Sequence, residues 1–210
     1  MRNFIFSFTL SLVLVMGVEI SAGSPAHAAD THPAEVLVRQ TTDLITAQIR
    51  QEKEAIDNDS KILHELVNKI VLPHFDFNKM SAWVLGKYWR KANKNQKLEF
   101  TSQFRILLVR TYANALADNA DRKIDYLPIR SKKETDVTVR TEIEQPGSFS
   151  LPINYKMYLK DSNWKVYDVN IDGISLVTNY RTSFSTEVRK SNIDGLISKL
   201  AKRNKQAENE

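Results

Sequence analysis

The chain has 210 residues, of which 42% are hydrophobic and 26% charged, with a formal net charge of +5 at pH 7 and no cysteine. The absence of cysteine excludes disulfides, a thiol nucleophile, thiolate metal ligands and a lipid-modified cysteine anchor, so the fold must depend on its own core. Because the basic residues are scattered among carboxylates, an anionic membrane surface or an acidic protein is a better-matched partner than nucleic acid.

The N-terminus has the features of a secretory signal peptide. Arg2 gives a basic start, residues 4–18 are almost continuously apolar, and residues 26–28 (Ala-His-Ala) have the small-x-small pattern that signal peptidase cleaves. The apolar stretch, about 15 residues long, is shorter than the roughly 20 that a membrane-spanning helix needs. We therefore expect residues 1–28 to be removed and residues 29–210 to form one soluble periplasmic domain, with an uncleaved anchor as the alternative.

Helical spacing dominates the first half of the mature chain. Apolar side chains recur there at steps of three and four residues, which predicts amphipathic helices. The segments are residues 33–49, 62–70, 77–85 and 95–117. The last of them has the most apolar face, and we expect a β-sheet to cover it, because the next segment supplies one.

From residue 124 onward the period changes to two, which is typical of β-strands. The expected strands are residues 124–130, 136–143, 151–159 and 164–171, the first at a sheet edge because it contains Pro128. Helical spacing then returns in residues 176–188 and 193–200. This order predicts an α+β fold in which helices pack on a small antiparallel sheet of about four strands.

The sequence contains no motif of a common catalytic, nucleotide or metal site. A nucleophile elbow, a P-loop and a dinucleotide fingerprint are all missing. His32, His64 and His74 lack the spacing of metal ligands. We expect no catalytic residue, no metal and no cofactor.

Asp168 and Asp172 flank the end of the last expected strand. A carboxylate there could act as a general base in an apolar pocket, as in ketosteroid isomerases. The other interpretation is structural: the pair caps the following helix or binds an arginine such as Arg181.

Two sequence blocks are specific enough to compare with a known family. The first is residues 74–90 (HFDFNKMSAWVLGKYWR), and the second is residues 164–184, which include Trp-Lys-Val-Tyr-Asp-Val and Asp-Gly-Ile-Ser-Leu-Val. Together with residues 193–197 (Ile-Asp-Gly-Leu-Ile), they resemble the MlaC family, also known as toluene-tolerance periplasmic proteins.

The resemblance implies a carrier that helps to maintain outer-membrane lipid asymmetry. Such a protein binds phospholipid as cargo and passes it between an outer-membrane lipoprotein–porin complex and an inner-membrane ABC transporter with a substrate-binding ring. The acyl chains would lie in an apolar cavity between sheet and helices.

By position, the lining of such a cavity is expected on the inward strand faces and the facing helix. The expected lipid-binding residues are Phe104, Leu108, Tyr112, Val137, Val139, Ile153, Tyr155, Met157, Val169 and Ile171. Which face of the last strand points inward stays undecided, because Trp164 and Val166 alternate to the side opposite Val169. Two other functions also stay open: a periplasmic enzyme with Asp168 as general base, and an adaptor that binds only proteins.

Overall fold

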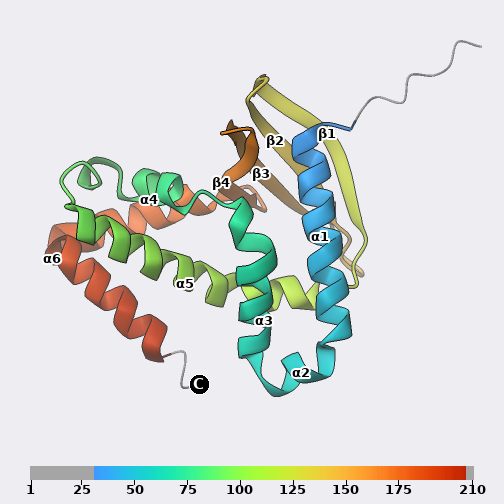
Figure 1. Cartoon of the computed structure of the whole chain (residues 1–210), viewed down its shortest axis with the longest axis horizontal. Coiled ribbons are helices and arrows are strands. Elements are labelled where there is room, and N and C mark those ends of the chain that lie inside the picture. Colours follow the sequence, from blue (N-terminus) through green and yellow to red (C-terminus); the bar gives the residue numbers. More distant parts are fainter. Residues whose placement is uncertain (1–30, 207–210) are drawn as a thin grey trace, which may run out of the picture. The chain divides into compact units, whose positions relative to one another are not determined.

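The structure is a computed structural model that describes residues 31–206. The expected signal peptide lies outside these residues, so its cleavage stays a prediction. Helices form the first part of the described chain, a sheet follows, and a long helix ends it (Figure 1). The helical segments are α1 (Pro33–Gln51), α2 (Lys53–Asn58), α3 (Ser60–Leu66), a π-helical turn η1 (Val67–Val71), the short 3-10 segments η2 (Leu72–His74) and η3 (Gly86–Tyr88), α4 (Phe77–Leu85), α5 (Lys94–Asp118) and α6 (Leu176–Gln206). The strands are β1 (Ile124–Lys133), β2 (Asp136–Ile143), β3 (Leu151–Lys160), β4 (Asn163–Ile171) and β5 (Ile174–Ser175).

Side-chain caps explain where several helices begin. His32 accepts a hydrogen bond from the Ala34 N–H of α1 (3.1 Å), next to a proline in the first turn. At α5, Asn93 and Gln96 cap each other's backbone N–H groups at 2.9 and 3.0 Å, which forms a capping box. These contacts satisfy N–H groups that a helix leaves unpaired at its start.

The five strands form one antiparallel sheet in the order β1-β2-β3-β4-β5. In β2, Val137, Val139, Thr141 and Ile143 are buried, and the residues between them are half-buried. The alternation follows from the period of two along a strand, so one face of the sheet is apolar and the other polar. The predicted α+β fold is confirmed.

A β-bulge in β4 settles which residues of this strand face inward. Met157 pairs with Val166, but the preceding residue of β3 pairs with Asp168, so Tyr167 is an extra residue in β4. An extra residue reverses the alternation of side chains along the strand. Val166 and Val169 therefore face the same side of the sheet, which the sequence alone left undecided.

Our expectation that the sheet covers the apolar face of α5 is wrong. The buried Phe100, Phe104, Leu107 and Leu108 instead pack against α4 and α6 in an all-helical core, which we call the helical cluster. Phe104 meets the ring of Tyr180 of α6 edge-on, with ring centroids 5.4 Å apart. The apolar face thus has the burial it requires, but helices provide it.

A kink in α6 lets this helix cover α5. Asn192 has φ 61° and ψ −173°, so the helical backbone is interrupted there. The Asn192 side chain accepts a hydrogen bond from the Gly195 N–H (3.0 Å) and caps the second half of the helix. The kink lies between the two helical segments that the sequence predicted.

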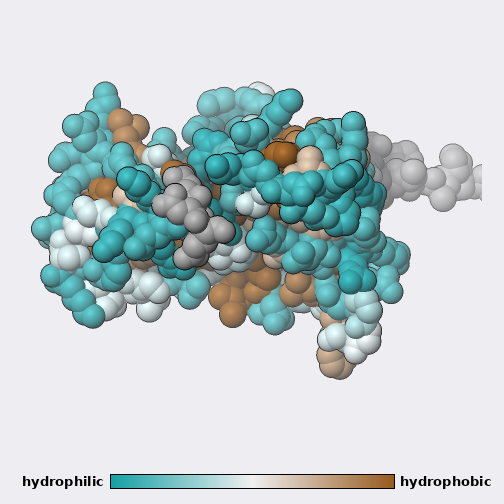
Figure 2. Space-filling model, turned by 90° about the horizontal axis from the view of Figure 1, so that it is seen from below, coloured by the Kyte–Doolittle hydropathy of each residue, from teal (hydrophilic) through white to brown (hydrophobic). Residues whose placement is uncertain are grey.

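Within residues 31–206, no helix combines the length and apolarity needed to cross a membrane. The face of the molecule in Figure 2 is mostly hydrophilic and carries separate apolar patches.

Candidate functional site

The apolar face of the sheet forms one wall of the candidate site. Cross-strand pairs stack on this face: Ile153 with Ile171, Tyr155 with Val169, and Met157 with Val166. α1 packs over the same face. We call the resulting core, with its partly buried neighbours, the sheet cluster; it contains Ala34, Leu37, Val38, Phe75, Tyr112, Tyr126, Ile129, Val137, Val139, Ile153, Tyr155, Met157, Trp164, Val166, Val169, Ile171 and Leu176.

Part of this wall remains accessible, although protein surrounds it. Val137, Val139 and Met157 are buried, whereas Ile153, Tyr155 and Ile171 keep accessible surface. Burial nevertheless raises the pKa of Tyr155 to about 12. Tyr155 is thus surrounded by protein and still keeps accessible surface, as do its neighbours Ile153 and Ile171 on the same face.

Aromatic side chains bridge the sheet cluster and the helical cluster. Tyr112 of α5 and Phe75, which precedes α4, pack against both clusters. Burial, together with a hydrogen bond to Tyr180, raises the pKa of Tyr112 to about 12. Tyr112 and Phe75 therefore mark the junction of the two clusters.

Hydroxyl groups on this wall have partners within the protein. Thr141 donates to the Ile153 carbonyl (2.9 Å) and is hydrogen-bonded to Tyr155. Tyr126 is hydrogen-bonded to Thr42, and its ring lies 3.6 Å below the Arg39 guanidinium. With the hydroxyls satisfied, the wall is suited to apolar ligand groups.

The structure brings together seven of the ten expected lining residues on the inner sheet face: Val137, Val139, Ile153, Tyr155, Met157, Val169 and Ile171. Tyr112 joins them from α5, but Phe104 and Leu108 are buried in the helical cluster. Among the members of the sheet cluster that sequence reasoning did not select are Phe75, Tyr126 and Ile129. Period-two spacing could have included Tyr126, whereas a bulge in β1 obscures Ile129.

A family model described as MlaC protein matches residues 39–202. The chain belongs to the MlaC family. It is 27% identical over 203 residues to the Haemophilus influenzae protein named intermembrane phospholipid transport system binding protein MlaC, covering 93% of this chain and 89% of that protein. It is 25% identical over 189 residues to toluene tolerance protein ttg2D of Pseudomonas putida, covering 87% of each chain.

A solved structure is also similar to this MlaC-family chain. It is the phospholipid-binding protein from Ralstonia solanacearum in complex with a phospholipid, which is 30% identical in sequence. The two structures superpose with a TM-score of 0.76, covering 82% of this chain and 97% of that chain.

Asp168 of this MlaC-family chain makes contacts that stabilise the fold. It pairs with Lys156 on the sheet face opposite Tyr155, and the Lys156 ammonium lies 2.8 Å from its Oδ2. Ser175 donates to the same oxygen (2.8 Å), and the Val177 N–H of α6 donates to Oδ1 (3.2 Å). Asp168 therefore ties the sheet to the start of α6, which favours the capping interpretation over a general base in an apolar pocket.

Asp172 and Arg181, the other residues named in these two interpretations, have contacts elsewhere. Asp172 lies in the turn after β4 with φ 49°, and its N–H donates to the Pro152 carbonyl (3.0 Å). Arg181 covers Gly86, where an added Cβ would lie 3.1 Å from the guanidinium. In the described part of the MlaC-family chain, no three acidic, histidine or cysteine side chains are grouped as metal ligands.

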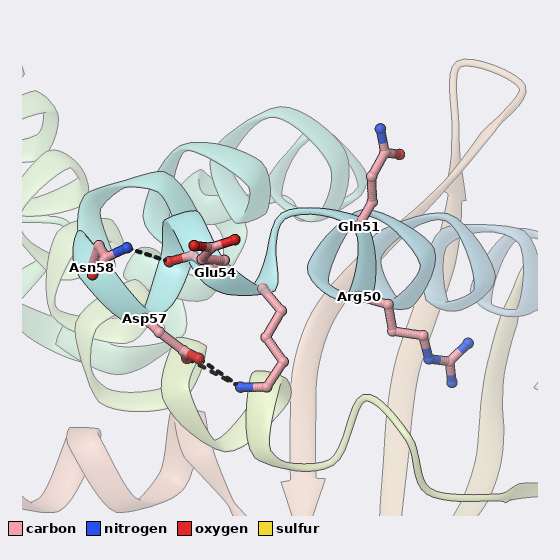
Figure 3. Close-up of a pocket in the computed structure, with 6 residues that line it drawn as sticks. Arg50, Gln51, Glu54, Asp57 and Asn58 are labelled. Atoms are coloured by element: carbon pink, nitrogen blue, oxygen red, sulfur yellow. Dashed lines mark hydrogen bonds and ion pairs between the residues drawn. The ribbon is translucent and has the colours of Figure 1, made fainter.

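A surface hollow of about 580 Å3 near α2 has a different character (Figure 3). Its lining residues are Arg50, Gln51, Lys53, Glu54, Asp57 and Asn58. The Lys53 ammonium is 2.8 Å from Asp57, while Arg50 and Gln51 extend away from this pair. Because all its side chains are polar, this hollow is unsuited to acyl chains.

Proposed function

We propose that this protein is a phospholipid carrier that holds acyl chains against the inner face of the sheet and moves the lipid between membranes. The observation that carries the proposal is the apolar inner face of the sheet, on which Ile153, Tyr155 and Ile171 keep accessible surface. The names of its relatives support the same function, since one belongs to an intermembrane phospholipid transport system and one binds a phospholipid.

The size of the hydrophobic effect explains why a carrier needs an enclosed interior. Moving one methylene from water into an apolar site is favourable by about 0.8 kcal/mol. For two acyl chains with about 30 methylenes, the transfer from the site into water therefore costs on the order of 20 kcal/mol. Spontaneous release would be too slow to be useful. The lipid must therefore leave through direct contact with another apolar conduit.

We assign the carrier to the periplasm. The signal-like N-terminus supports this location, and an inner-membrane ABC transporter and an outer-membrane lipoprotein–porin complex are the proposed docking partners. The basic net charge of +5 suits acidic docking surfaces or anionic head groups.

The test is to place a bulky side chain on the accessible part of the inner sheet face. Ile153→Trp adds a large ring at an accessible inner-face position. We expect the phospholipid extracted per mole of purified protein to fall several-fold while the thermal unfolding transition stays cooperative, because the ring occupies ligand space rather than packed core.

Phe149→Trp is the matched control, because Phe149 is 95% exposed in the β2–β3 connection. Its lipid content should equal that of the wild type. A folded Ile153→Trp protein with undiminished lipid would contradict the assignment of this wall, and a lipid-free wild type would contradict the carrier function.

A further inference from the structure

The connection between α4 and α5 combines cations with accessible apolar surface. It contains η3 and leads into the first turns of α5, on the side of the helical region away from the strands (Figure 1). Residues 87–98 include five cations and no carboxylate. We call this segment the α4–α5 patch; its charged, aromatic and exposed apolar members are Lys87, Tyr88, Trp89, Arg90, Lys91, Lys94, Lys97 and Leu98.

The positive charges of the patch are not neutralised within the protein. Four of the five are exposed: Lys87, Arg90, Lys91 and Lys94. The ion pairs found among residues 31–206 involve none of the five. Asp194 borders the patch, but it accepts a hydrogen bond from the Gln96 amide (2.9 Å) rather than from a cation.

The patch also accounts for the net charge of the whole chain. The sequence has 30 Lys and Arg residues, and leaving out the five of the patch gives 25, which equals the number of Asp and Glu residues. The excess of +5 is therefore matched by a single segment without carboxylates. A concentrated charge of this kind attracts an anionic partner more strongly than the same charge spread over the surface.

Aromatic rings are interleaved with these cations. Tyr88 and Trp89 are half-buried at the margin of the helical cluster. The Lys87 ammonium lies 5.3 Å from the ring centroid of Tyr88, and the Lys97 ammonium lies 5.4 Å from that of Trp89. Leu98 is 60% exposed. This combination is typical of surfaces between water and an apolar phase, because each ring has an apolar body and a polar group.

Backbone hydrogen bonds hold the patch in a fixed conformation. The Trp89 N–H donates to the Gly86 carbonyl (3.2 Å), and the Lys91 N–H donates to the Tyr88 carbonyl (3.0 Å). The capping box of Asn93 fixes the start of α5 within the patch. A surface that is already ordered loses little conformational entropy when it binds.

The composition of the patch favours a membrane over a protein as its partner. Four of the five cations are lysines, and protein–protein interfaces are depleted in lysine and enriched in arginine. A lysine ammonium is a hydrated point charge, which suits a diffuse layer of negative charge better than a fixed pair with one carboxylate. Each Lys or Arg close to an anionic bilayer strengthens binding about fivefold.

We propose that the α4–α5 patch docks the protein on the surface of an anionic phospholipid bilayer. The cations would lie at the level of the lipid phosphates, and Tyr88, Trp89 and Leu98 would contact the boundary of the acyl region. The inference goes beyond the carrier function, because it concerns the outer surface of the protein and holds whether or not lipid occupies the interior.

The experiment measures sedimentation of the protein with vesicles of phosphatidylcholine, with and without one quarter of phosphatidylglycerol. We expect the wild type to bind the phosphatidylglycerol vesicles at about 0.1 M salt and to lose most of this binding at about 1 M salt or without phosphatidylglycerol. For Lys87→Gln combined with Arg90→Gln and Lys91→Gln, the partition coefficient should fall on the order of a hundredfold. The charge-retaining set Lys87→Arg, Arg90→Lys and Lys91→Arg should bind like the wild type, which separates loss of charge from misfolding.

Arg130→Gln combined with Lys132→Gln and Lys133→Gln is the matched control, because it removes the same charge from exposed positions of β1. It should retain most of the binding, since at about 0.1 M salt charges more than about 10 Å from the bilayer are largely screened. An equal loss in the two variants would overturn the proposal, because net charge alone would then explain the attraction.

Uptake of lipid into the interior is distinguished from docking by the state of the protein. Protein with its co-purified lipid and delipidated protein should bind the vesicles equally, and binding by delipidated protein alone would overturn the proposal in favour of uptake. A wild type that binds neither kind of vesicle would also overturn it, and the patch would then suit an acidic protein surface. The carrier function is tested separately by the lipid that co-purifies.

Discussion

Asp76 fastens the segment before α4 to the sheet with a single carboxylate. Its Oδ1 accepts the Lys79 N–H (2.9 Å), and its Oδ2 accepts the Tyr158 hydroxyl (2.5 Å) and the Lys160 ammonium (3.0 Å). Burial by itself would raise the pKa of Asp76, but the hydrogen bonds from Tyr158, Lys79 and Lys160 together lower it below its ordinary value of 3.8.

This shift predicts a specific loss of stability in acid. The Asp76 carboxyl binds a proton less readily in the folded protein than in the unfolded chain. Its contribution to the free energy of unfolding is therefore complete at pH values above 3.8, the ordinary pKa, and is lost as the pH falls toward the lower pKa of the folded state. Asp76→Asn should cost about 1–2 kcal/mol at neutral pH. Urea unfolding between about pH 5 and about pH 3 should then show a smaller decline for the variant than for the wild type.

The exposed Asp57→Asn change on α2 is the control, and it should retain the decline of the wild type. An equally steep decline in Asp76→Asn would show that Asp76 is not a source of the acid sensitivity.

Asp168→Asn tests the structural role of this carboxylate. The change removes the ion pair with Lys156 and weakens the bonds to the start of α6. Because Lys156 is 35% exposed and can turn to water, we expect a loss of about 1–3 kcal/mol in chemical denaturation. The lipid content should not change, since Asp168 faces away from the apolar wall; loss of lipid at unchanged stability would contradict this role.

At the scale of elements, the close contact between Gly195 and Ser191 at the α6 kink leads to a prediction about stability. A Cβ on Gly195 would lie 2.5 Å from the Ser191 Cβ, which the backbone holds in place. Gly195→Ala should therefore lower the free energy of unfolding by about 1–3 kcal/mol. Thermal unfolding that matches the wild type would show that the kink can relax.

Asn192→Gly is the comparison variant at the same kink. Glycine adopts the positive φ of this position without strain, so only the cap on Gly195 is lost. We expect it to destabilise less than Gly195→Ala. The reverse order would contradict the steric explanation.

Elements with one buried face could be predicted from the sequence, and elements without one could not. Residues 77–85 and 136–143 were expected as a helix and a strand, and they are α4 and β2. α2 has no buried residue, so its sequence contains no apolar stripe to detect. β5 has only two residues, too few to show a period.

At the scale of the whole molecule, the sequence predicted which faces of the helices and strands are apolar, but not which elements cover those faces. The period of two correctly grouped the inner residues of β2 and β3, whereas the bulge at Tyr167 left no signal in the spacing of β4. The apolar stripe of α5 was recognised, but α6 folds back over it through the kink at Asn192. Long-range pairing of this kind depends on the tertiary fold, which periodicity does not encode.

The account depends on whether lipid occupies the interior behind the sheet. Native mass spectrometry of the protein purified after export measures this most directly. We expect a main species heavier than the polypeptide by the mass of a phospholipid, which organic extraction releases. A single species at the polypeptide mass, from protein that was never exposed to detergent, would contradict the account.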